Sequence, residues 1–108
     1  MPADTPFEIA GPTLRVDVTT SAASGDLGVD APQLAIWNSD DTDAICIRFF
    51  TSSLLASAGA AVMPTVGTPR LGHVIPPNTY TVITPRGRYF NVIGTGAAVI
   101  YMTPGEGA

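Results

Sequence analysis

The sequence predicts an all-β protein, an antiparallel β-sandwich with a jelly-roll-like order of about seven to eight short strands. Short runs in which apolar and polar residues alternate are typical of half-buried strands. Turns separate these runs, and the 108 residues include 11 glycines and 10 prolines. Strands at roughly ten-residue spacing favour a sandwich or barrel. We expect one domain over residues 1–108, with extended arms at 1–6 and 104–108.

The expected strands follow one another along the chain at residues 14–20, 33–38, 44–50, 70–75, 79–84, 88–94 and 97–103, with 7–10 as an additional edge strand. The first of them shows the pattern most simply, because Leu14, Val16 and Val18 alternate with polar residues and so share one face. Jelly-roll and immunoglobulin-like orders give nearly the same strand signals, so the sequence leaves the topology open.

The segments between the strands are expected to be hairpin-like turns or loops. The stretches "PRG" (85–87) and "GTG" (94–96) have turn composition, and "NSDDTD" (38–43) is expected to be a hairpin tip. Residues 21–32 are expected to form a long loop. The alanine-rich segment 52–63 is expected to be an irregular excursion with a short helix, because Gly59 argues against a long one.

The low charge of the chain predicts a surface covered by other subunits. Charged residues make up 13%, against about 25% in a typical globular protein. A small domain with so few charges gains by oligomerising. The net charge is −4 and all five basic residues are arginines, which argues against nucleic-acid partners and against a polybasic membrane contact. Neither a membrane span nor a signal peptide is expected.

No arrangement of residues indicates catalysis, so we predict no catalytic residue, no cofactor and no enzymatic activity. Cys46 is the only cysteine and lies in an apolar run, which favours a small buried side chain over a reactive thiol. His73 is the only histidine, and the nucleophile motif G-x-S-x-G is absent.

Three aspartates in the stretch "DDTD" raise the question of a metal site. Asp41 and Asp43 alternate as calcium ligands often do, but the glycine and distal glutamate of an EF-hand are missing. A turn also uses aspartates for its own local hydrogen bonds. We therefore predict a solvated turn and keep Asp41 and Asp43 as the alternative cation site. Asp40 and Asp41 are also candidates for contact with an arginine of a neighbouring subunit.

The second group of candidate interface residues lies in the stretch "TPRGRYF". Arg86 and Arg88 form the one basic prominence of an acidic chain, next to Tyr89. Arginine and aromatic residues are favoured as interface anchors, so an intersubunit role and simple solvation stay open here. Trp37 has the same chemistry but is expected in the core.

The order of these segments resembles a family of small tailed-phage virion proteins over residues 7–107. The resemblance depends on "LAIWN", on "AICIRFFTSS", on the proline-containing "VIPPNTYTVI" and on the closing "AAVIYMTPGEG". The family more usually has a glycine where this chain has Phe50, and the tip "DDTD" is more acidic than the family pattern.

The resemblance implies a decoration or cement protein, found on the capsid surface of the virion and made in the host cytoplasm. Its partners would be the major capsid protein and copies of itself, with a trimer favoured and a dimer second. A trimeric head-fibre or neck and tail component is the alternative. A carbohydrate-binding β-sandwich is the second alternative, disfavoured because most aromatic residues fall where the core is expected.

Overall fold

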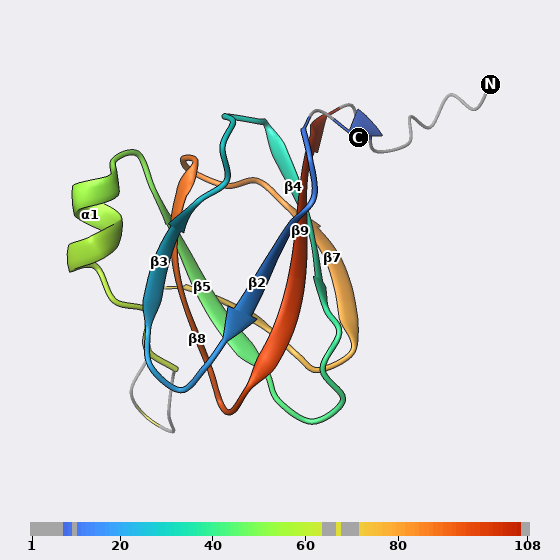
Figure 1. The fold of residues 1–108 in the computed structure, drawn as a ribbon, viewed down its shortest axis with the longest axis vertical. Helices are drawn as coiled ribbons and strands as arrows, with labels where there is room; N and C mark the ends of the chain where they lie inside the picture. The colour runs from blue at the N-terminus through green and yellow to red at the C-terminus, as the bar shows by residue number, and fades with distance from the viewer. Residues whose placement is uncertain (1–7, 10, 64–66, 68–71, 107–108) are drawn as a thin grey trace.

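The chain folds into two antiparallel β-sheets that pack face to face, which confirms the predicted all-β sandwich (Figure 1). The computed structural model describes residues 8–9, 11–63, 67 and 72–106. Sheet A contains β1 (Glu8–Ile9), β2 (Leu14–Val18), β4 (Gln33–Asn38), β7 (Thr79–Ile83) and β9 (Ala98–Glu106). Sheet B contains β3 (Ala23–Asp26), β5 (Ile45–Phe50), β6 (His73–Ile75) and β8 (Tyr89–Gly94).

The strand order is that of a jelly roll. In sheet A, β9 lies between β2 and β4, and β7 pairs with the other edge of β4. In sheet B the order is β3–β8–β5–β6. The chain alternates between the sheets from β2 to β5 and again from β6 to β9, so most pairs of neighbouring strands are far apart in the sequence.

The expected hairpin turns are wrong, because each of them crosses between the sheets. The acidic stretch leads from β4 in sheet A to β5 in sheet B, "PRG" leads from β7 to β8, and "GTG" leads from β8 to β9. Turn composition shows where the chain reverses direction, but it carries no information on which strand the chain pairs with next.

Two further expectations about the chain need correction. The loop expected at 21–32 contains the strand β3, whose sequence "ASGD" has no large apolar residue to signal it. The expectation of an arm at 104–108 is wrong for residues 104–106, because β9 continues to Glu106 and Pro104 is buried opposite Leu34. Residues 98–102 of β9 pair with β2, and residues 105–106 pair with β1. Pro104 lies between these two pairings, where the N–H that proline lacks is not needed for either of them. The arm 1–6 and residues 107–108 lie outside the described residues, as do residues 70–71 of the strand expected at 70–75.

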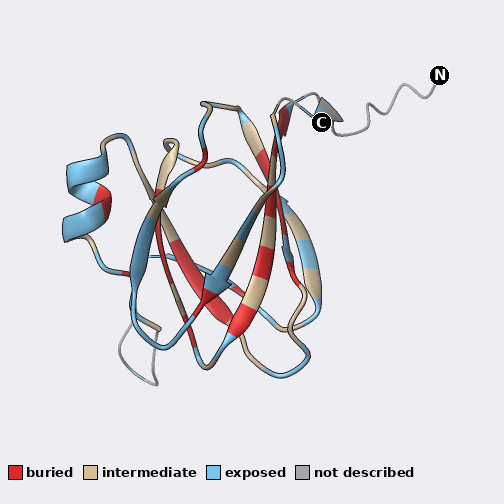
Figure 2. Ribbon diagram, viewed as in Figure 1, coloured by how far each residue is buried: buried red, intermediate tan, exposed pale blue. Residues whose placement is uncertain are grey.

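The hydrophobic core lies between the inner faces of the two sheets (Figure 2). Its fully buried members come from both sheets and include Leu34, Ile36, Ile45, Ile47, Ile75, Val92, Ile100 and Met102. Cys46 is also buried, as predicted, and burial raises the pKa of its thiol.

The helix α1 (Ser53–Ala58) packs outside sheet B, where the sequence predicted a short helix. The hydroxyl of Ser52 caps its first turn by accepting a hydrogen bond from the backbone N–H of Leu55. The buried Asn91 of β8 holds the segment down, donating to the carbonyl of Ala56 and accepting from the N–H of Ala61 at 2.9 Å each. In the part of the chain that the structure describes, no helix is long and apolar enough to cross a bilayer.

Candidate binding surface

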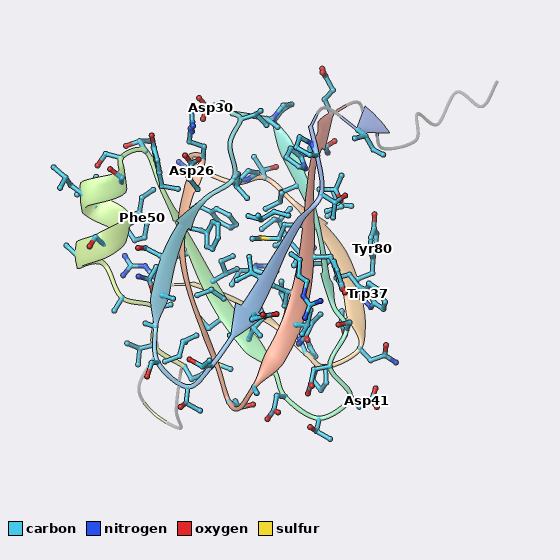
Figure 3. The ribbon with its side chains drawn as sticks, in the orientation of Figure 1. Asp26, Asp30, Trp37, Asp41, Phe50 and Tyr80 are labelled. Atoms are coloured by element: carbon cyan, nitrogen blue, oxygen red, sulfur yellow. The ribbon has the colours of Figure 1, made fainter. Side chains whose placement is uncertain are left out.

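Three aromatic side chains form a row across the outer face of sheet A. Tyr101 of β9, Trp37 of β4 and Tyr80 of β7 are direct cross-strand neighbours. The rings of Trp37 and Tyr101 stack, with centroids 5.6 Å apart and planes inclined by 25°. Trp37 is 43% exposed and Tyr80 is 63% exposed, and both project away from the sandwich (Figure 3). We call these three residues the aromatic row.

Strand alternation explains why these residues point outward. Leu34 and Ile36 of β4 face the core, so Trp37 falls on the opposite face. The expectation that Trp37 lies in the core is therefore wrong. Ile100 and Met102 place Tyr101 outward in the same way. This parity was visible in "QLAIWN" and "AAVIYMT" and could have located the row from the sequence.

The surroundings of the aromatic row are apolar on one side and polar on the other. Val82 of β7 shares the outer face with Tyr80 and is also exposed. Beyond Tyr101 lies its cross-strand neighbour Arg15 on β2, whose Nε is 3.1 Å from a carboxylate oxygen of Asp17. Because adjacent strands lie about 4.8 Å apart, the row spans about 10 Å across three strands. A stiff sheet therefore presents a flat aromatic strip with a polar border.

A second exposed apolar group lies on the side of the molecule where α1 covers sheet B. Leu54 and Leu55 of α1 are exposed, Leu54 at 82%, and Val62 in the segment after the helix is exposed as well. We call these three residues the helix patch. Figure 1 shows α1 and β7 at opposite sides of the molecule, so the helix patch and the aromatic row are separate surfaces.

Two of the interface candidates in "TPRGRYF", Arg88 and Tyr89, interact within the chain itself. Arg88 donates two hydrogen bonds of 2.9 Å to the carboxylate of Asp26 and lies 5.3 Å from the ring centre of Tyr89. This pairing lowers the pKa of Asp26 and raises the pKa of Arg88. Arg86 is exposed and has no ion pair within the described residues.

The acidic stretch is organised by local hydrogen bonds. The carboxylate of Asp40 accepts the backbone N–H groups of Thr42 and Asp43, which lowers the pKa of Asp40. Asp43 accepts the hydroxyl of Thr95 at 2.9 Å, and Asp41 is exposed. Across the described ranges, no three His, Cys, Asp or Glu residues are grouped so that they could hold a metal ion. The alternative cation pair Asp41 and Asp43 therefore has no third carboxylate, imidazole or thiol group beside it in these ranges.

The interface candidates drawn from the sequence do not form one surface. Arg88 and Tyr89 lie with Asp26 at one end of the sandwich, and Asp41 lies at the other end (Figure 3). The aromatic row is a separate exposed group that the sequence reasoning missed.

Comparison with known proteins gives one weak similarity. No family model and no curated protein matches the chain. Among solved structures, the chain is similar to hydroquinone 1,2-dioxygenase from Sphingomonas sp. TTNP3 with 4-hydroxybenzoate bound, with a TM-score of 0.41 and 12% identity. That alignment covers 100% of this chain and 68% of the dioxygenase chain. A similarity at this level carries no information about fold or activity.

Proposed function

We propose that this protein is a structural component of a tailed-phage virion that binds the outside of the capsid and clamps adjacent capsid subunits, without catalytic activity. The aromatic row carries the proposal, because a chain with 13% charged residues exposes Trp37 and Tyr80 on a rigid sheet, beside the half-buried Tyr101. The resemblance of the strand segments to small phage virion proteins supports the same class. The major capsid protein is the proposed partner.

The energetics of the aromatic row suit a docking surface. Burying a large apolar side chain contributes roughly 1.5–3 kcal/mol before the costs of association are subtracted. Tryptophan and tyrosine are enriched among residues whose truncation weakens an interface most. The row lies on paired strands, so little conformational entropy is lost when its backbone is held by a partner.

A clamp needs at least two contact surfaces, and two separate apolar surfaces are present. The aromatic row lies on sheet A and the helix patch lies beside sheet B, so one molecule can contact two neighbours at once. Copies of the chain itself are the second proposed partner, with a trimer favoured over a dimer. Repetition of modest contacts over a whole shell would then resist the internal pressure of packaged DNA.

Heating capsid shells with and without the protein tests the clamping role. DNA-filled shells that lack the protein are mixed with the purified chain, and occupancy is measured by gel densitometry. Rupture is followed by the fluorescence of a dye that binds the released DNA. We expect full occupancy to raise the rupture temperature. An unchanged rupture temperature at full occupancy would contradict the clamping role.

Imaging of the native particle separates this proposal from the head-fibre, neck and tail alternatives. A decoration protein occupies the whole shell in many copies. A fibre or neck component is confined to one or a few positions on the particle. Density confined in this way would contradict the decoration role and support the head-fibre, neck or tail alternative.

The exposed aromatic row also favours a second candidate function, carbohydrate binding, because aromatic faces stack on the apolar faces of sugar rings. Trp37 is the only tryptophan, so the fluorescence of the protein reports on this surface directly. Titration with cello-, malto- and chito-oligosaccharides would give a saturable emission change if the row binds sugars. A flat titration with all three would remove this candidate.

A further inference from the structure

The edge of sheet A that β7 forms has no feature that would keep another strand from pairing with it. Within the described residues β7 pairs with β4 alone, so the backbone groups on its other side point away from the sheet. Its sequence, "TYTVI", contains no charged residue, no proline and no glycine. β-Branched and aromatic residues of this kind favour strand pairing. Figure 1 shows β7 at the side of the molecule opposite α1.

The other edge strands are each protected by a device that natural β-sheets use against unwanted pairing. β2 carries the exposed charges of Arg15 and Asp17. β3 is contacted by α1, and its Asp26 is held in an ion pair. β1 and β6 are only two and three residues long. Among the strands that the structure describes, β7 is therefore the edge most open to a further strand.

A second copy of β7 matches this edge in an antiparallel register centred on Thr81. In this register all five residues of each strand are paired. On the outer face it sets Tyr80 of each copy opposite Val82 of the other, an aromatic and β-branched pair of the kind that stabilises antiparallel sheets. Thr79 then lies opposite Ile83, and Thr81 meets its own counterpart. Two copies can therefore pair without placing like charges opposite each other.

The same register would bring opposite charges together at both ends of the paired strands. The acidic stretch lies at the start of β7, because the N–H of Asn78 donates to the carbonyl of Asp40 at 2.8 Å. Arg86 follows shortly after the end of β7. Antiparallel pairing sets the end of one strand beside the start of the other, so Arg86 of each copy would come near Asp41 of the other. Both side chains are exposed, and neither has an ion pair within the described residues.

We propose that two copies of this chain pair through their β7 edges, antiparallel and two-fold symmetric about Thr81. The inference rests on the self-association proposed above and names its contact, and it does not depend on binding to a capsid. A two-fold contact forms a dimer, and it joins two trimers where a three-fold contact also acts. Sheet A then continues from one copy into the next, and both aromatic rows face the same side.

Sedimentation velocity of the whole chain from about 1 μM to about 1 mM tests the proposal, because a contact of five residues on each strand is small and dissociates on dilution. We expect a concentration-dependent doubling of the mass. Val82→Lys places a charge on the paired edge and should raise the dissociation constant at least about tenfold. Val74→Lys on β6 is the matched control, since Val74 is 40% exposed and Val82 is 39% exposed, and it should stay within about twofold. No doubling, or equal effects of both variants, would overturn the proposal.

Exchanging the charges at the strand ends tests the register. Arg86→Glu places two carboxylates beside each other and should weaken the association roughly tenfold, because the contact occurs twice in a two-fold pair. Asp41→Arg should weaken it by a similar factor. The double variant restores opposite charges and should return the dissociation constant to within about twofold of the wild-type value. Additive losses in the double variant would contradict this register.

Nuclear magnetic resonance on a mixture of labelled and unlabelled chains distinguishes edge pairing from face-to-face packing of the aromatic rows. Edge pairing predicts contacts between Tyr80 of one copy and Val82 of the other, with slower exchange of the β7 amides that point away from β4. Contacts between the Trp37 rings of two copies, without slower exchange in β7, would overturn the proposal. Slower exchange that appears only when capsid shells are added would mean that another chain occupies the edge, and it would overturn the proposal as well.

Discussion

Trp37 and Tyr101 lie directly opposite each other on β4 and β9, and their rings stack on the solvent side of sheet A. Such a pair adds about 0.5–1.5 kcal/mol beyond the area that it buries, so each ring is held in place by the other. The outward aromatic row is therefore a preorganised feature of the fold, available to a partner at little entropic cost.

Replacing Trp37 separates its surface role from a core role. We expect Trp37→Ser to lower the free energy of unfolding by about 1 kcal/mol, the size of the lost stacking. Ile36→Ala, at the neighbouring inward position, should cost about 2–5 kcal/mol because it leaves a cavity. Urea unfolding measures both values. Equal losses would mean that Trp37 belongs to the core.

Gly25 and Phe90 define a second test, because a single methyl group added at Gly25 should lower the stability of the fold. Gly25 pairs with Phe90 across β3 and β8, and a Cβ at Gly25 would lie 2.4 Å from the ring of Phe90. We expect Gly25→Ala to lower the free energy of unfolding by about 1–3 kcal/mol through overpacking. Ser24→Ala, at the next and exposed position, should change it by less than about 0.5 kcal/mol. A neutral Gly25→Ala would show that the ring does not press on this strand.

Asn91 should control the attachment of α1 to sheet B. Asn91→Leu leaves the carbonyl of Ala56 and the N–H of Ala61 without their partner, at about 1–3 kcal/mol for each buried group. We expect amide exchange in residues 53–61 to accelerate more than exchange in the core strands. Asn38→Leu is the control, since the buried Asn38 instead holds the carbonyls of Ile75 and Pro76. Selective loosening of α1 in the control would argue against this account.

Stability should fall in acid because two aspartates have lowered pKa values in the folded state. The Arg88 side chain lowers the pKa of Asp26, and backbone N–H groups lower the pKa of Asp40. A lowered folded pKa stabilises the protein above the unfolded pKa near 4, and this stability is lost as the pH falls through the folded value. Both groups are solvent-accessible, so the effect is small.

Melting temperatures measured from pH 7 to pH 3 check this expectation. Asp26→Asn and Arg88→Gln should each reduce the acid-induced decline, and the double variant should behave like either single variant because one ion pair is removed in all three. An additive double variant would show that the two residues act separately.

Alternation was the informative signal in this sequence, and it located most of the strands and the core. Ile45 and Ile47 face inward as the pattern in 44–50 predicts, and the capping serine and the alanines at 52–63 form a short helix. The same alternation places Trp37 outward, whereas the general tendency of tryptophan toward burial predicts the core. A prediction from parity alone would have found the aromatic row.

Other features could not be read from local patterns. β3 is a strand because it pairs with β8, and Gly25 leaves room there for the ring of Phe90, a residue 65 positions away in the sequence. The crossing of each turn between the sheets depends on which strands pair. Contacts between distant segments decide this, such as those of Asn38 on β4, which donates to the carbonyls of Ile75 at the end of β6 and of Pro76.

Co-sedimentation with capsid shells of a variant that lacks two members of the aromatic row tests the central claim most directly. The wild-type chain, Trp37→Ser/Tyr80→Ser and the control Val74→Ser, which removes an exposed apolar side chain from sheet B, are each mixed with shells that lack the protein. We expect the wild type and the control to bind shell-wide and the double variant to bind at least about tenfold more weakly, as for interface anchors. Wild-type affinity in the double variant, or no binding by the wild type, would contradict the account.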